Sequence, residues 1–324
     1  TPPYDAAGWT LAYQMGVEFD KVFEGFDGPF ELIEGFAEVD AGTVTNADGV
    51  GFLLSHQVND AFIAVNRLLD AGDQVNWLTS SIEVNGEAYP VGTMYIPAVE
   101  GTVARLNEMA SEIGLDFVGM DSEPSGRAHR LQPVRIGLWD RYGGSSQSGW
   151  TRWLLEQFEF PFDVVYPQRL DAGNLIDDFD VLIFETGAIS PELDRAGNPR
   201  TQAEQPDPES IPERYRDRLG SITSDVTIPQ IRRFMNAGGT VIGLGSSASL
   251  GYHAGLPIRD ALVDPSTGRP LPMERYWAPG SVHQMRVDNN NPLAYGMSER
   301  LDVYFNRNPV FRMTPNRTVR RVGW

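Results

Sequence analysis

The sequence contains no cysteine among its 324 residues. The chain can therefore form no disulfide, no thiolate metal site and no cysteine nucleophile. Lysine is also scarce, because Lys21 is the only one and the rest of the Lys+Arg total is arginine. No apolar run approaches the length of about 20 residues that a membrane-spanning helix needs, and no signal-peptide pattern is visible. We therefore expect no thiol chemistry and no membrane span.

The charge balance is strongly acidic. Asp and Glu number 44 against 26 Lys and Arg, which gives a formal net charge of −18. An acidic surface repels phosphate backbones and anionic lipid, so we expect no nucleic-acid partner. The length and the hydrophobic content of 41% allow a large core and favour two domains over one.

A polar break at residues 121–133 separates two apolar patterns, and we place the domain boundary there. Residues 1–132 are predicted to form a small α/β accessory domain. Its expected elements are strands at 51–54, 74–79 and 92–97 and helices at 59–71 and 103–113. The order of strand, helix and strand predicts parallel pairing in this half.

Residues 133–324 repeat the alternation of strand and helix. The expected elements are strands at 134–139, 163–166, 179–184 and 240–244 and helices at 149–158 and 228–237. This pattern predicts a doubly wound, flavodoxin-like parallel sheet in which the strand at 240–244 is buried. A polar insertion at 190–224 is expected to be a surface excursion or a lid. Strands at 282–287, 301–305 and 318–322 are expected to follow.

The turn after Val241-Ile242-Gly243-Leu244 is the most informative segment. The segment resembles the class I glutamine amidotransferase-like fold, in which a cysteine sits on the sharp turn after such a strand. On that pattern Gly245 stands in the place of the cysteine, and a glycine cannot supply a thiolate. Ser246 is displaced by one residue, and no histidine and acid accompany it in a motif. We therefore favour a structural turn over a serine nucleophile, within a domain truncated at its C-terminus.

Three phrases carry a second resemblance. They are Tyr-Asp-Ala-Ala-Gly-Trp-Thr-Leu-Ala-Tyr-Gln-Met-Gly-Val at 4–17, Gly-Trp-Thr-Arg-Trp-Leu-Leu-Glu-Gln-Phe at 149–158, and Pro-Gly-Ser-Val through Asn-Pro-Leu-Ala-Tyr-Gly-Met at 279–297. They are similar to the region that follows the catalytic domain in large bacterial zinc carboxypeptidases. The resemblance implies a secreted or periplasmic metallopeptidase of the carboxypeptidase A type, of which this chain is the C-terminal accessory half. The implied partner is the catalytic domain of that parent protein, and zinc is expected only there.

The histidines test whether zinc could bind in this chain. A zinc carboxypeptidase holds its metal through a His-x-x-Glu pair and a distant histidine. Each of the four histidines has a residue other than glutamate three positions later; the pairs are His56 and Asn59, His129 and Gln132, His253 and Leu256, and His283 and Arg286. We therefore expect no metal, no cofactor and no peptidase activity in this chain.

The candidate binding residues follow the predicted strands of the second half. Ligands of open α/β sheets gather at the carboxyl ends of the strands. The residues expected at that edge are Asp140, Arg141, Tyr142, Glu185, Gly245, Ser246 and Ser247. Asp140 and Glu185 could do acid–base work on a glycoside, as paired carboxylates do. They could equally be solvated residues at strand ends, and we favour a vestigial or ligand-recognising cleft.

Two further features have a structural and a functional interpretation. His56 follows the first buried strand, where it could bind a ligand or, as we favour, form a local hydrogen bond. Trp139, Tyr142, Trp150 and Trp153 are expected to be mostly core residues, although one or two could form a platform for a sugar or peptide.

Three functions from different classes remain open. We favour a noncatalytic accessory region with a peptide-binding, glycan-binding or scaffold role. The alternative is a stand-alone hydrolase that uses Ser246 or the carboxylates of Asp140 and Glu185. A third possibility is an assembly domain that contributes a dimer interface.

Overall fold

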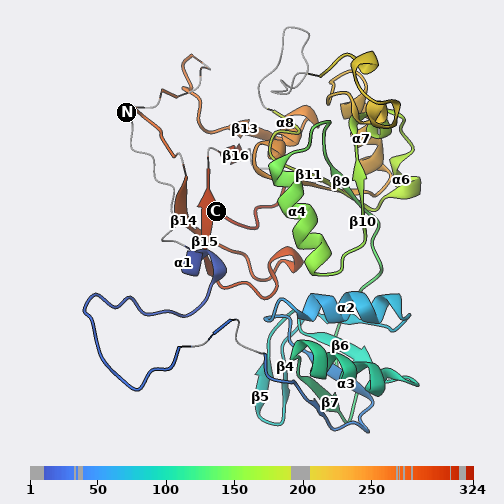
Figure 1. The fold of residues 1–324 in the computed structure, drawn as a ribbon, viewed down its shortest axis with the longest axis vertical. Coiled ribbons are helices and arrows are strands. Elements are labelled where there is room, and N and C mark those ends of the chain that lie inside the picture. The colour runs from blue at the N-terminus through green and yellow to red at the C-terminus, as the bar shows by residue number, and fades with distance from the viewer. Residues whose placement is uncertain are drawn as a thin grey trace. The chain divides into compact units, whose positions relative to one another are not determined.

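The computed structural model describes residues 11–32, 34–35, 39–190, 205–267, 269, 271–272, 274–278, 280–306, 308–313 and 319–324. Its contacts divide the chain into two compact units, each with its own sheet (Figure 1). The mixed-sheet unit comprises residues 8–133, 284–303 and 322–324, and the parallel-sheet unit comprises 134–283 and 304–321. Segment 284–303 thus makes its contacts with the mixed-sheet unit, although we had assigned it to the domain at 133–324. None of the described helices has the length and apolar content that a membrane crossing requires.

The mixed-sheet unit contains a six-stranded sheet with the strand order β1-β7-β2-β6-β3-β8. Its elements are α1 (Leu11–Met15), β1 (Val44–Thr45), β2 (Gly51–Leu54), α2 (Ala61–Asp70), β3 (Asn76–Leu78), β4 (Ile82–Val84), β5 (Glu87–Tyr89), β6 (Met94–Pro97), α3 (Thr102–Ile113), β7 (Phe117–Met120) and β8 (Ala128–Arg130). The edge strand β8 lies inside the break that we predicted at 121–133.

The predicted parallel pairing in this half is wrong. Strands β2 and β3 run in the same direction but do not pair, because β6 lies between them and is antiparallel to both. Strand β7 is also antiparallel to β2, and only β1 and β7 pair in parallel. The chain turns back after β3 through the β4–β5 hairpin, and the returning β6 occupies the edge of β2 that a parallel neighbour would need. The order β2-α2-β3-β6-α3-β7 is the split βαβ arrangement of ferredoxin-like sheets.

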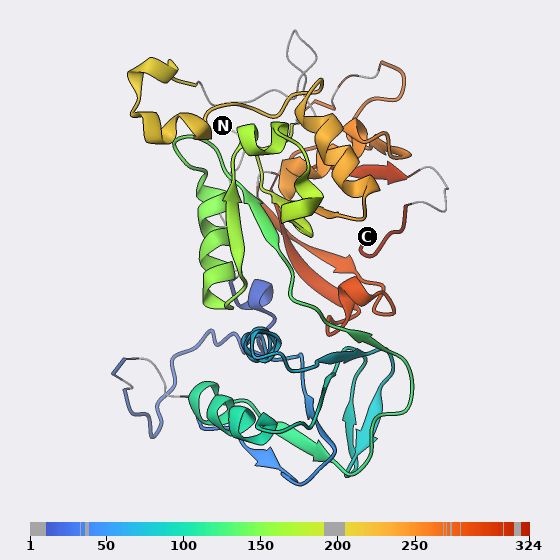
Figure 2. The ribbon, with the colours of Figure 1, turned by 90° about the vertical axis from the view of Figure 1, so that its right-hand side faces the viewer.

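Successive side chains of β2 face two different apolar clusters, as the period of a strand requires. Phe52 and Leu54 belong to a cluster that also contains Leu68 of α2 and Leu106 of α3. Leu53 belongs to a second cluster with residues packed from the β4–β5 hairpin. The two helices therefore cover one face of the sheet and the hairpin covers the other (Figure 2).

The parallel-sheet unit contains a four-stranded sheet with the order β10-β9-β11-β12, in which every pair is parallel. Its elements are β9 (Ile136–Trp139), α4 (Ser146–Gln157), β10 (Phe162–Val165), α5 (Pro167–Asp171), α6 (Leu175–Asp178), β11 (Val181–Phe184), the 3₁₀ helices η2 (Pro208–Ser210) and η3 (Glu213–Arg218), α7 (Thr227–Asn236), β12 (Thr240–Gly243), η4 (Gly245–Ser249) and α8 (Leu250–His253). A mixed α/β chain with a parallel sheet and helices is thus confirmed.

Helices pack on both faces of this sheet (Figure 1). Leu182 and Phe184 of β11 share a buried cluster with residues of α5, α6 and α7. Ile183 lies on the other face, in a cluster with Leu155 of α4. The alternation along β11 therefore directs its side chains into two cores, which is why the strand is an unbroken apolar run.

Two expectations for this unit are wrong. Strand β12 is not buried, because it is an edge strand, and Ile242 and Leu244 are 42% and 40% exposed. Of the aromatic residues expected to be mostly core, Trp139 is buried, whereas Trp150 and Trp153 are not core residues, since they are 71% and 53% exposed on α4. Only Ser148 and Leu155 of that helix are buried, so its apolar side extends beyond what the small cluster against β9 and β11 covers.

Four short strands follow these elements. β13 (Ile258–Asp260) pairs with β16 (Phe311–Met313), and β14 (Ser281–Arg286) pairs with β15 (Arg300–Phe305). The strands predicted at 282–287 and 301–305 are confirmed. The beginning of the predicted strand at 318–322, residues 191–204 of the predicted insertion and residues 4–10 of the first phrase lie outside the described residues.

Candidate functional site

The centre of the parallel sheet is a topological switch point. Strands β9 and β11 are neighbours, and the strands that follow each of them, β10 and β12, lie on opposite outer sides. The loops that leave the carboxyl ends of β9 and β11 therefore diverge, and such a divergence forms the usual ligand crevice of open α/β sheets. Asp140 directly follows β9, and Glu185 directly follows β11. His56 belongs to the mixed-sheet unit, where it follows β2.

Glu185 is a buried carboxylate that joins β11 to α4. Its side chain belongs to a residue only 5% exposed. Thr151 of α4 donates its hydroxyl to Oε1, and the Thr186 amide donates to Oε2 over 3.3 Å. Burial of a carboxylate is costly unless hydrogen bonds compensate it, and these two donors do so here. The site therefore contains one carboxylate whose position is set by its neighbours.

Ser246 and Ser247 connect the loop after β12 to the loop after β11. Ser247 is fully buried; its hydroxyl donates to the Glu185 carbonyl over 2.5 Å and accepts from the Ile189 amide over 3.0 Å. The hydroxyl of Ser246 accepts from the Gly187 amide over 2.9 Å. A serine nucleophile needs a base that takes its proton. The hydrogen bonds described for both serines instead involve backbone groups.

Gly245 occupies the sharp bend between β12 and these serines. Its φ of +52° lies in the left-handed region, which favours glycine. A Cβ atom at this position would lie 2.0 Å from Oγ1 of Thr186, so any side chain would require Thr186 to move. The backbone at Gly245 thus bends as at a nucleophile-bearing turn. The space that a side chain would need there is occupied by Thr186.

The loop after β9 is organised around Asp140. Its Oδ1 accepts hydrogen bonds from the amides of Arg141 over 2.8 Å and Ser145 over 2.9 Å. Arg141 donates to a backbone carbonyl in the same loop, and Tyr142 lies half-buried beside it. Among the described hydrogen bonds, none links Asp140 to Glu185 through a shared partner. The structure thus brings the predicted residues to one edge, where each carboxylate belongs to its own local network.

Two side chains at this edge were missed by the sequence analysis. Tyr166 directly follows β10, and the guanidinium carbon of Arg218 lies 5.2 Å from the centre of its ring. Burial raises the pKa of Tyr166; nearby Arg218 lowers it and nearby Asp140 raises it. The strand-end rule could have identified Tyr166. Arg218 has no such signal, because it lies in the polar insertion, where no periodic pattern marks it.

His56 forms a separate feature of the mixed-sheet unit. The side chain is 6% exposed, and neither ring nitrogen has a hydrogen-bond partner among the described residues. A Cβ on Gly296 would lie 2.3 Å from the ring, and one on Gly92 would lie 3.0 Å from Nε2. Burial lowers the pKa of His56. His56 is therefore a packed residue at which segment 284–303 contacts the sheet, and the local hydrogen bond that we favoured is not among those described.

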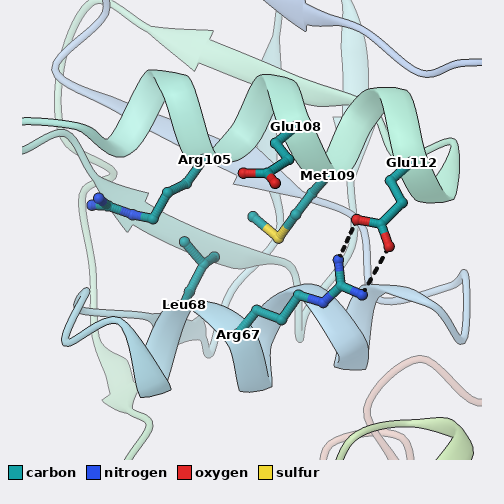
Figure 3. A pocket seen from close by; sticks show the side chains of 6 residues that line it. All are labelled: Arg67, Leu68, Arg105, Glu108, Met109 and Glu112. Atoms are coloured by element: carbon teal, nitrogen blue, oxygen red, sulfur yellow. Dashed lines mark hydrogen bonds and ion pairs between the residues drawn. The ribbon is translucent and has the colours of Figure 1, made fainter.

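A groove of about 390 Å³ lies between α2 and α3 (Figure 3). Its lining includes Leu68 and Met109 as well as charged side chains from both helices. Arg67 forms an ion pair with Glu112 at 2.7 Å, and Arg105 forms one with Asp73 at 2.7 Å. Both guanidinium groups are thus neutralised from within the unit, so this groove is a poorer anion site than the edge of the parallel sheet.

In the described ranges no three His, Cys, Asp or Glu side chains lie close enough together to hold a metal. His253, the histidine nearest in sequence to the serine turn, contacts the Ser190 carbonyl through Nε2 over 3.0 Å. Comparison of the chain with protein-family models, curated proteins and solved structures found no match.

Proposed function

We propose that this chain is a noncatalytic accessory region of a secreted zinc carboxypeptidase-like protein, and that it recognises a peptide or glycan at the carboxyl edge of its parallel sheet. The partner in this proposal is the catalytic domain of the parent protein, which would supply the zinc. The proposal also includes the finer fold: a doubly wound, flavodoxin-like sheet related to class I glutamine amidotransferases.

The noncatalytic part of the proposal rests on the structure of the turn after β12. Gly245 provides the bend but no reactive atom, and its Cβ position is occupied by Thr186. Ser246 and Ser247 use their hydroxyls to connect two loops through backbone groups. Such an arrangement favours a rigid rim over an activated nucleophile. A rigid support of this kind is what a recognition site needs.

The finer fold is supported by strand order. The order β10-β9-β11-β12 corresponds to 2-1-3-4 along the chain, which matches the first four strands of the flavodoxin-like order 2-1-3-4-5. The parent is supported by the three phrases at 4–17, 149–158 and 279–297 alone. A His-x-x-Glu pair and a later histidine in the reading frame before Thr1 would strengthen that assignment.

Hydrolysis assays on the purified chain test the noncatalytic proposal. Peptide and glycoside substrates are offered with and without added Zn²⁺ to the native chain and to Ser246→Ala and Glu185→Gln. We expect no turnover in any of the three proteins. Turnover that either substitution abolishes would establish the alternative hydrolase. Binding of peptides and oligosaccharides on arrays, weakened by Glu185→Gln or Asp140→Asn, is the expected positive result.

A further inference from the structure

The guanidinium group of Arg218 lies against two tyrosine rings. Its central carbon is 5.2 Å from the ring centre of Tyr166 and 4.9 Å from that of Tyr215. Cation–π contacts of this kind hold the planar group in place while leaving its N–H donors available. All three residues are half-buried. The cation is thus oriented before any ligand arrives.

Arg218 has no ion-pair partner within the part of the chain that the structure describes. Two other arginines of the same unit are paired, since Arg135 binds Asp180 at 2.8 Å and Arg152 binds Glu156 at 2.9 Å. A net charge of −18 means that carboxylates are abundant. An arginine that is stacked and half-buried but unpaired in such an acidic chain has its donors free for an external anion.

Asp140 supplies an opposite charge near Tyr166, the ring on which Arg218 stacks. Its amide donates to the Val165 carbonyl over 3.1 Å, so Asp140 lies next to the strand end that carries Tyr166. Its Oδ1 is occupied by two loop amides, whereas no hydrogen bond is described for Oδ2. A cation and a carboxylate oxygen are therefore both near Tyr166 at this edge.

We infer that Arg218, Tyr166 and Asp140 bind the terminal carboxylate and an adjacent N–H group of a peptide. The guanidinium fork matches a carboxylate, because both are planar and can form two parallel hydrogen bonds. The free oxygen of Asp140 accepts the N–H of the ligand. A peptide carries both groups, whereas a uronic acid offers the carboxylate without an amide. This inference rests on the proposed recognition function and names its ligand class.

Calorimetric titration of the full chain with three probes tests the inference. The probes are trialanine with a free carboxyl group, its C-terminal amide, and trigalacturonic acid. We expect trialanine to bind, its amide to bind at least about tenfold more weakly, and the acidic sugar to bind more weakly than trialanine. Arg218→Gln should weaken trialanine binding by at least about tenfold, since charge-assisted hydrogen bonds are lost.

Arg214 provides a matched control in the same 3₁₀ helix. Its guanidinium carbon lies 4.8 Å from the ring centre of Tyr215 but is not described against Tyr166. We expect Arg214→Gln to change trialanine binding by less than about twofold. Arg218→Lys keeps the charge without the fork and should give an intermediate loss. Thermal melting of each variant shows whether it remains folded.

The outcomes separate this inference from the proposed function. Equal binding of trialanine and its amide, or equal losses in the Arg218 and Arg214 variants, would refute the carboxylate site. Binding of trigalacturonic acid but not trialanine would refute the peptide and leave glycan recognition standing. If neither probe binds and arrays detect no ligand that depends on Asp140 or Glu185, both ideas are wrong.

Discussion

The adjacent serines after β12 allow a stability prediction that compares a buried hydroxyl with a half-buried one. Ser247→Ala removes a fully buried hydroxyl that donates to the Glu185 carbonyl and accepts from the Ile189 amide. Ser246→Ala removes a half-buried hydroxyl that accepts from the exposed Gly187 amide. The two substitutions delete the same atom from neighbouring positions.

The expected cost follows from which groups lose their partner. Without Ser247 Oγ, the buried Ile189 amide loses its hydrogen-bond partner, whereas the Glu185 carbonyl keeps the hydrogen bond from the Ala188 amide over 3.0 Å. An unsatisfied buried group costs about 1–3 kcal/mol, so we expect Ser247→Ala to lower the free energy of unfolding of the parallel-sheet unit by about 1–3 kcal/mol. Water can replace Ser246 Oγ at the exposed amide, so Ser246→Ala should cost less than about 1 kcal/mol.

Urea unfolding monitored by hydrogen exchange measures this difference. Peptides from β11 and β12 report the parallel-sheet unit separately, which matters because a chain with two units need not unfold in one step. The amides of Ile189 and its neighbours should exchange faster in Ser247→Ala. A loss for Ser246→Ala equal to or larger than that for Ser247→Ala would refute the argument from burial.

Three further predictions concern the mixed-sheet unit. Arg105→Met should destabilise it by about 3 kcal/mol in urea titrations, because the Asp73 side chain, 1% exposed, loses its cation, whereas Arg67→Met breaks only an exposed pair and should have little effect. Burial lowers the pKa of His56 below its ordinary 6.5, so the folded state binds fewer protons than the unfolded state. The stability of the unit should therefore fall as the pH drops below about 6.5. His56→Gln should flatten that pH dependence in a series of thermal melts. Gly296→Ala should lower the melting temperature, because its φ is +82° and the new Cβ would lie 2.3 Å from the His56 ring; an unchanged melt would contradict that packing.

Local patterns predicted the elements well where a single segment carries its own signal. The helix over 228–237 corresponds to α7, and the glycine after it has a φ of +102°, as the predicted stop requires. The apolar run before Glu185 predicted β11. Because parallel strands share a carboxyl edge, these elements also indicated that Asp140, Glu185 and the serine turn belong to one side of the sheet.

Pairing between distant segments could not be read in the same way. The position of β6 between β2 and β3 depends on which strand pairs with an open edge of the sheet. The sequence shows neither which edge is open nor which strand pairs with it. Exposure of Trp150 likewise depends on how much of α4 the sheet covers, since helical spacing identifies an apolar side without showing what packs on it.

The sequence by itself determined the alternation of strands and helices, the absence of thiol chemistry and the side of the sheet on which polar residues gather, because each depends on composition or on a short repeat. Tertiary structure decided that β12 is an edge strand, that Thr186 occupies the space beside Gly245, and that Arg218 stacks on Tyr166, 52 positions earlier in the chain. These last features depend on contacts between segments far apart in sequence, and such contacts exist only once the sheet has brought the segments together.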